Sequence, residues 1–183
     1  MSHRHLMSWI VASALLLFGS AAWATVLITV EEALELAFPG AITTRQTLFL
    51  SDDQRNRAEK ESGAEVSSAL ATRYVAKNAK GAVLGWAYLD THRVRTLPET
   101  LMVVLGVDGA VRRVEVVTFR EPLEYMPREG WYGQYEGQTL DDDLALKREI
   151  RPVTGATLTA RATTEAVRRV LAIHAVAVQE ETP

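Results

Sequence analysis

Residues 101–119 read LMVVLGVDGAVRRVEVVTF, and this stretch determines what kind of fold the chain can adopt. Two apolar runs rich in β-branched residues, 101–107 and 111–119, flank the dipeptide Asp108-Gly109. Asp-Gly between such runs is a strong hairpin signal, because both residues tolerate positive φ. We therefore predict a β-hairpin over 101–119.

The flanking sequence adds a second hairpin and several helices. Alternation over 71–76 and 82–89 around a polar turn predicts two more antiparallel strands. The pairs Thr29/Glu32 and Ser51/Gln54 have the spacing of capping boxes and predict two helix starts. An amphipathic pattern after residue 157 predicts a long C-terminal helix. Together these elements predict the α+β fold class: one domain with a mostly antiparallel, curved sheet and flanking helices.

Three smaller expectations concern the remaining segments. The glycines, prolines and aromatic residues of 120–138 indicate an ordered loop or a broken helix. The acidic run 141–143 predicts an exposed helix start. We expect His92 in a polar loop and His174 on the apolar side of the last helix, both as packing residues without a catalytic role.

Composition excludes several classes of protein. The chain has 183 residues, no cysteine and a net charge of −3. Without cysteine there is no disulfide framework, no zinc-thiolate site, no covalently attached c-type haem and no cysteine nucleophile. The slightly acidic balance provides no positive field that would attract a nucleic acid, and we expect none as a partner.

The first 24 residues have the pattern of a secretory signal peptide. Arg4 precedes a short apolar run over 10–18, and Ala22-Trp23-Ala24 has small residues where a signal peptidase reads them. The alternative is a membrane anchor, but a span needs about 20 apolar residues and this run is shorter. We predict cleavage after Ala24 and an exported, periplasmic mature chain over 25–183.

Common catalytic and metal-binding signatures are missing from the sequence. There is no HExxH, Gly-x-Ser-x-Gly, dinucleotide or Walker motif, and the acidic run does not have EF-hand spacing. We therefore predict no metal site and no catalytic residue. There remains a set of small, hydroxylated residues around Gly155 before the last helix, namely Thr154, Ala156, Thr157, Leu158 and Thr159. Physically this is either an anion site at a helix start or an ordinary helix cap.

The sequence Thr154-Gly155-Ala156-Thr157-Leu158-Thr159 resembles the [Ser/Thr]-Gly-Ala-Thr-x-[Thr/Ser] flavinylation motif of the FMN-binding domain family. This family includes the G subunit of Rnf-type electron transport complexes and the C subunit of the sodium-translocating NADH:quinone reductase. The resemblance implies a covalent FMN, joined by a phosphoester to Thr157, with the rest of the motif binding the cofactor. It also implies an FMN transferase as a partner.

Other segments resemble the same family. They are the Phe-Pro-Gly at 38–40, the Gly-x-x-x-Gly-aromatic strand at 81–86, the hairpin at 107–111 and the segment 132–137 before the family's final strand. The resemblance implies a place near the flavin for Glu121. Trp131, Tyr125 and Trp86 are candidates for packing against the ring, or else for core packing. Arg151 stands where the family carries an acidic residue, and could pair with the FMN phosphate, Glu149 or solvent.

The function expected from this resemblance is electron transfer. The chain would carry electrons on its FMN at the outer face of the cytoplasmic membrane, for a membrane or periplasmic redox partner. This makes it a carrier or a subunit of an oxidoreductase complex more than a stand-alone enzyme. The alternative is a non-redox binding or accessory module that keeps the fold without flavinylation, and Arg151 favours it.

Overall fold

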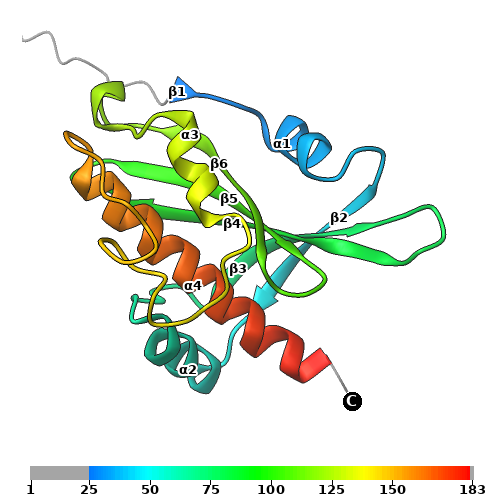
Figure 1. The fold of residues 1–183 in the computed structure, drawn as a ribbon. Coiled ribbons are helices and arrows are strands. Elements are labelled where there is room, and N and C mark those ends of the chain that lie inside the picture. The colour runs from blue at the N-terminus through cyan, green and yellow to red at the C-terminus, as the bar shows by residue number, and fades with distance from the viewer. Residues whose placement is uncertain (1–24, 182–183) are drawn as a thin grey trace, which may run out of the picture.

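Six antiparallel strands form an open sheet in the computed structural model, which describes residues 25–181 (Figure 1). The strand order is β1-β6-β5-β4-β3-β2. The strands are β1 (Thr25–Val26), β2 (Ile42–Phe49), β3 (Leu70–Lys77), β4 (Val83–Arg93), β5 (Pro98–Gly106) and β6 (Val111–Phe119). The expected α+β class with an antiparallel sheet is confirmed. The predicted signal peptide, residues 1–24, lies outside the described residues.

Both predicted hairpins are present in the sheet. Gly109 has φ +77° in the turn between β5 and β6, and the turn is closed by a hydrogen bond from Gly106 N to Ala110 O of 2.9 Å. A φ in this range is readily adopted by glycine. The strands β3 and β4 pair over most of their length, with a register shift at Ala76 and Lys77. The Asp-Gly signal and the alternation therefore identified the centre of the sheet.

Capping explains where the helices before β3 begin. The helix α1 (Val30–Ala37) starts after Thr29, whose hydroxyl accepts from Glu32 N at 3.1 Å. The helix α2 (Asp52–Ser62) starts after Ser51, whose hydroxyl accepts from Gln54 N at 3.2 Å. In both helices the side chain of the third helical residue accepts a hydrogen bond from the backbone amide of the N-cap residue, so both capping boxes are confirmed.

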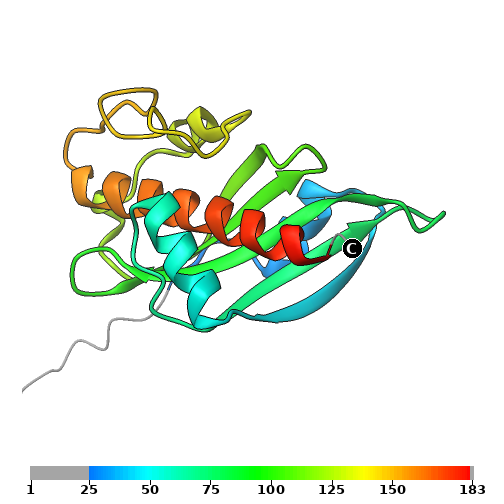
Figure 2. The same ribbon diagram turned by 90° about the horizontal axis from the view of Figure 1, so that it is seen from below.

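The helices cover the two faces of the sheet separately. The long helix α4 (Thr157–Glu181) and α2 lie side by side on one face, with α1 behind the sheet (Figure 2). Leu101, Val103 and Leu105 of β5 point to the α4 face, whereas Met102 and Val104 point to the α1 face. Among the described helices, none has the length and apolar character that crossing a bilayer requires.

Two of the family-like segments meet on the α1 face. Phe38 ends α1, and its aromatic ring packs against Gly85 of β4. A Cβ added to Gly85 would overlap both this ring and the backbone carbonyl oxygen of Leu105 on the neighbouring strand. Only glycine therefore lets the Phe-Pro-Gly segment sit this close to the sheet.

We expect Gly85→Ala to destabilise the fold by about 1–3 kcal/mol, because the added methyl group must displace the Phe38 ring or bend the strand. Urea unfolding followed by circular dichroism measures the change. The control is Gly130→Ala, where a Cβ would meet nothing within 4 Å. Equal stability of the two variants would contradict this packing account.

Between β6 and α4 the chain forms short helices and loops. They are the 3₁₀ turn η1 (Leu123–Tyr125), the helix α3 (Glu129–Tyr132) and the 3₁₀ turn η2 (Gly133–Tyr135). The expectation of an ordered, broken helix over 120–138 is therefore confirmed. The resemblance predicts a final strand after 132–137, and this prediction is wrong for the described chain, which has no strand there. The backbone forms hydrogen bonds with β6 only at Val111, through Gly137 and Gln138.

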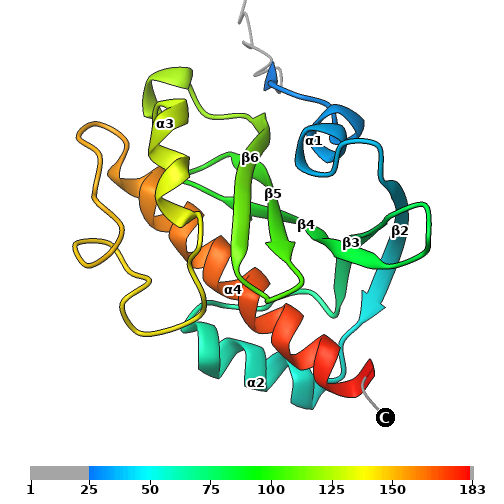
Figure 3. The same ribbon diagram turned by 45° about the vertical axis from the view of Figure 1, so that its right-hand side comes forward.

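The predicted helix start at 141–143 is also wrong. The Asp141 carboxylate accepts from the amides of Asp143 and Leu144, at 2.8 and 2.9 Å, and this local turn competes with helix formation. The loop is then fastened to α4, because Arg168 donates to the carbonyl oxygens of Asp141 and Leu144. Figure 3 shows this yellow-to-orange loop running alongside α4.

Candidate functional site at the start of α4

The turn that leads into α4 presents a threonine hydroxyl to solvent. Gly155 has φ +85°, and a Cβ added to it would meet nothing within 4 Å, so the space over the turn is open. Thr157 is the first residue of α4 and is exposed, while Ala156 before it is buried. The Thr157 hydroxyl donates one hydrogen bond within the described residues, to Val153 O at 3.2 Å. This hydroxyl is accessible from outside.

The electrostatics of this helix start favour an anion. The first amide to donate back into the helix is Ala160 N, to Ala156 O at 2.9 Å, so the amides of 157–159 precede the hydrogen-bonded ladder. The first turns of α1 and α2 each carry two acidic side chains, but the first turn of α4 carries none. The positive end of its dipole is therefore left for another negative group, such as a phosphate.

Thr159 connects this turn to the η1 segment. Its side chain is buried, and its hydroxyl donates to Tyr125 O at 2.5 Å. The ring of Tyr125 in turn lies under the Arg95 guanidinium, which is 4.5 Å from the ring centroid. The half-buried Tyr125 is thus held beside the first turn of α4.

Trp131 fixes the chain that enters the turn. Its indole Nε1 donates to Arg151 O at 2.7 Å, and Gln134 Oε1 accepts from Arg151 N at 2.9 Å. Trp131 also makes edge contacts with Tyr132 and Tyr135, at centroid distances of 5.3 and 5.5 Å. The Arg151 side chain is exposed and forms no ion pair with Glu149 or any other described residue.

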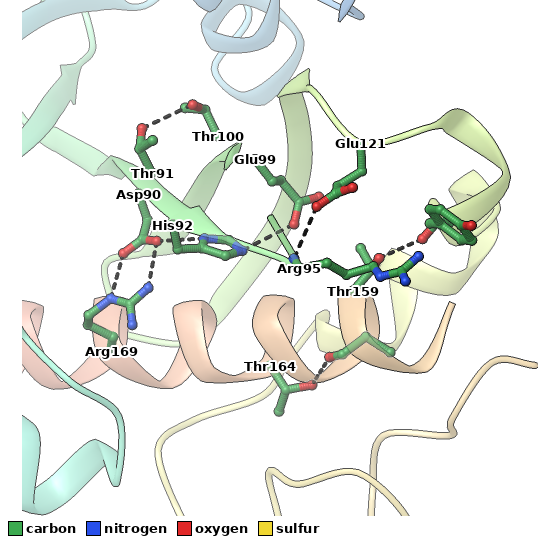
Figure 4. Close-up of polar contacts among 12 residues, drawn as sticks. Asp90, Thr91, His92, Arg95, Glu99, Thr100, Glu121, Thr159, Thr164 and Arg169 are labelled. Atoms are coloured by element: carbon green, nitrogen blue, oxygen red, sulfur yellow. Dashed lines mark hydrogen bonds and ion pairs between the residues drawn. The ribbon is translucent and has the colours of Figure 1, made fainter. Parts of the chain in front are cut away.

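Glu121 is buried and acts as a backbone acceptor. Its Oε1 accepts the amides of three consecutive residues at 2.7–3.2 Å: Arg95, Thr96 and Leu97. Burial acts to raise the pKa of Glu121, but these hydrogen bonds outweigh it and lower the pKa. Glu121 therefore orders the loop that carries Arg95 (Figure 4).

Trp86 lies away from this site. Its ring packs against His174, with centroids 4.7 Å apart, and His174 is buried and bonded to the Tyr88 hydroxyl at 3.0 Å. Seventeen residues of helix separate His174 from Thr157, or about 25 Å at the helical rise. The structure thus assigns Trp86 to core packing, and confirms His174 on the apolar side of the helix.

A groove of about 570 Å³ runs between α4 and β4. Its volume is in the range of small-molecule sites. The nearest lining residue of α4 is Ala162, about 7.5 Å along the helix from Thr157. A second cavity, of about 670 Å³, lies between α1, β6 and α3 and is lined by no residue of α4. Only the groove of about 570 Å³ is lined by α4, so only this groove can extend a site from the turn along the helix.

A buried cluster beside this groove was not predicted from the sequence. His92 lies in β4, so its expected place in a polar loop is wrong. Its Nδ1 contacts Asp90 at 2.9 Å and its Nε2 contacts Glu99 at 3.1 Å (Figure 4). Asp90 also accepts from Nε and a terminal nitrogen of Arg169, at 2.8 and 2.7 Å. Alternation along β4 from Tyr88 places Asp90 and His92 on the α4 face, and is the signal that could have revealed them.

The cluster makes stability depend on pH. Burial opposes protonation of His92, but hydrogen bonds to Asp90 and Glu99 outweigh it and raise its pKa from 6.5 to about 9. The folded state therefore binds the proton of His92 more tightly than the unfolded state does. The stability that protonated His92 contributes is complete below pH 6.5 and is lost as the pH rises through about 9.

We expect the stability advantage of the wild type over His92→Gln to shrink between these pH values. Urea midpoints measured across the range test this. An advantage that stays constant or grows with pH would contradict a protonated His92.

The protein is a small α+β domain in which an exposed threonine lies at the start of a helix whose first turn has no acidic side chain. Such a helix start suits the phosphate group of a cofactor. Residues 97–172 match the family model described as FMN-binding domain, which confirms the family resemblance. The match indicates flavin binding and electron transfer in general, and its span includes Glu121, Trp131 and the turn 154–159. No curated protein and no solved structure matches the chain.

Proposed function

We propose that this protein is an exported electron carrier whose FMN is joined by a phosphoester to Thr157. The observation that carries the proposal is the exposed Thr157 hydroxyl at a helix start without acidic side chains, inside the FMN-binding domain match. In the bond-forming step an FMN transferase joins the threonine oxygen to the FMN phosphorus. The bond between that phosphorus and the leaving oxygen of the flavin donor breaks, the leaving oxygen takes up the hydroxyl proton, and the protein gains the mass of one FMN less one water.

A covalent bond solves an affinity problem at so open a site. A helix start contributes only about 0.3–1 kcal/mol to holding an exposed phosphate, whereas micromolar binding needs roughly 8 kcal/mol. Tethering holds the ring at an effective concentration on the order of millimolar without that affinity. It also leaves an edge of the ring open to a redox partner.

Residues of the chain position the cofactor in this proposal. The amides of 157–159 would hold the phosphate, and Gly155 would let the backbone approach it. Trp131 fixes the incoming strand through Arg151 O, and Tyr125 provides an aromatic face beside the first turn. Thr157 serves as the attachment point. The bound flavin supplies one- and two-electron chemistry, which the protein itself lacks.

Export and membrane association are part of the proposal. They rest on the signal-peptide pattern of residues 1–24, and on the family resemblance, whose FMN domains lie on the outer side of the membrane. The redox partner would then be a membrane or periplasmic protein.

Flavin fluorescence tests the proposal. Protein expressed in the periplasm with an FMN transferase is expected to be yellow, and its fluorescence is expected to survive acid precipitation, because a phosphoester outlasts unfolding. The second candidate is a non-redox accessory module, favoured by Arg151 in place of an acidic residue. Colourless protein, or colour released by acid, would support that candidate or a non-covalent flavin, respectively.

A further inference from the structure

The described arginines differ in whether a carboxylate pairs with them. Six of them form ion pairs with carboxylates among the described residues: Arg55, Arg57, Arg112, Arg113, Arg148 and Arg169. Arg45 of β2 is exposed and has no carboxylate within 4.0 Å in the described chain. A second group with the same two properties lies near the start of α4: Arg93, Arg95, Arg128, Arg151 and Arg161. We call this second group the arginine collar.

The arginine collar surrounds the start of α4. Arg161 lies one helical turn after Thr157, on the same side of the helix. Arg151 is held by Trp131 and Gln134 at the entry to the turn. Arg95 and Arg128 lie beside the η1 segment, which Thr159 ties to α4, and Arg93 lines the groove that also contains Ala162 of α4.

The neighbours of Arg95, Arg93 and Arg128 show where these three arginines lie. Arg95 lies over the ring of Tyr125, whose carbonyl accepts from Thr159. Arg93 donates to Thr96 O in the same loop as Arg95. Arg128 precedes the first residue of α3, the helix that contains Trp131.

Two exposed leucines lie within this collar. Leu158 follows Thr157 directly and is 51% exposed, and Leu123 of η1 is also 51% exposed. An apolar centre with a charged rim is typical of protein–protein interfaces, in which arginine is enriched. Solvation of two leucines has a free-energy cost that a docked partner would remove.

Exposed arginines outnumber exposed glutamates at this end of the molecule. Four exposed glutamates share this end of the molecule, against the five exposed arginines of the collar: Glu124, Glu129, Glu149 and Glu165. The complete chain carries a net charge of −3. The unpaired arginines therefore give this end groups that attract an acidic molecule.

We infer that the arginine collar, with Leu123 and Leu158, is the docking surface for an acidic redox protein. The inference rests on the proposed function, since the flavin on Thr157 would lie at the centre of this surface. The unpaired arginines favour a partner that brings carboxylates. Electron-transfer encounters commonly bury less than about 1,200 Å² and depend on electrostatic steering, which suits a small, charged surface.

The experiment uses the flavinylated mature protein, reduced under anaerobic conditions. Stopped flow measures its oxidation by anionic hexacyanoferrate(III) and by cationic hexaammineruthenium(III), with and without poly-L-glutamate. The test variant is Arg93→Gln/Arg128→Gln/Arg161→Gln. The matched control, Arg45→Gln/Lys77→Gln/Lys80→Gln, removes three exposed cations near the opposite part of the sheet.

At low salt we expect the test variant to react about tenfold more slowly than the wild type with hexacyanoferrate, and no more slowly with the ruthenium complex. Poly-L-glutamate should slow the hexacyanoferrate reaction of the wild type and of the control, but not of the test variant. The effects should weaken as salt is added.

Three results would overturn the inference. The first is equal loss of rate in the test and control variants. The second is a wild-type rate that poly-L-glutamate does not change. The third is collar-dependent binding to phosphatidylglycerol vesicles without competition by poly-L-glutamate, which would identify a membrane surface as the occupant. Protein that acquires no flavin under these conditions would instead contradict the proposed function, and the docking inference with it.

Discussion

Thr157→Ala is expected to abolish covalent flavin completely, because alanine has no oxygen to form the phosphoester. The fold should persist, since Thr157 is exposed and its hydroxyl makes one 3.2 Å bond to Val153 O. Acid-stable flavin fluorescence and intact mass measure the loss, and urea unfolding checks that stability changes by no more than about 1 kcal/mol.

Two further variants control this result. Thr139→Ala removes an exposed hydroxyl outside the motif and should retain all of the flavin. Thr157→Ser keeps a hydroxyl at the same position and should retain part of it. Covalent flavin that persists in Thr157→Ala would show that the attachment point lies elsewhere.

Asp90→Ala is expected to destabilise the fold by roughly 3–5 kcal/mol, because it leaves buried cations without their carboxylate. Asp90 bonds two nitrogens of Arg169 and one of His92, at 2.7–2.9 Å, with its side chain only 10% exposed. Hydrogen bonds from these partners lower the pKa of Asp90 despite its burial, which raises it. Urea or thermal unfolding at neutral pH measures the change.

A surface carboxylate provides the matched control for this variant. Asp52 pairs with Arg55 at 2.6 Å, but its side chain is 90% exposed, and such pairs contribute at most about 1 kcal/mol. Asp52→Ala should therefore lie close to the wild type. Similar losses in the two variants would mean that burial does not strengthen the Asp90 cluster.

Local signals in the sequence predicted most of the fold. The Asp108-Gly109 turn and the two capping boxes each act over a few residues, so their chemistry can be read without knowing the rest of the chain. The acidic run at 141–143 led to a wrong prediction, because the Asp141 side chain bonds nearby amides and forms a turn instead of a helix. Whether such a run caps a helix depends on how the next residues pack against the rest of the fold.

Long-range contacts account for the features that the sequence did not predict. Asp90 and Arg169 are 79 positions apart, and only the packing of α4 on β4 brings them together. The Glu121 carboxylate orders the loop at 95–97, about 25 positions away in the sequence, and its place near the flavin stays a prediction. The motif at 154–159 is the part of the candidate site that could be read directly, because its residues are consecutive.

The most direct test of covalent flavinylation is the mass of the protein purified from the periplasm after co-expression with an FMN transferase. Trypsin does not cleave before Pro152, so residues 149–161 should be released as one peptide that contains the whole motif. We predict an intact mass increased by one FMN less one water, with fragmentation placing the addition on Thr157. An unmodified mass, or an addition on any other residue, would contradict the account.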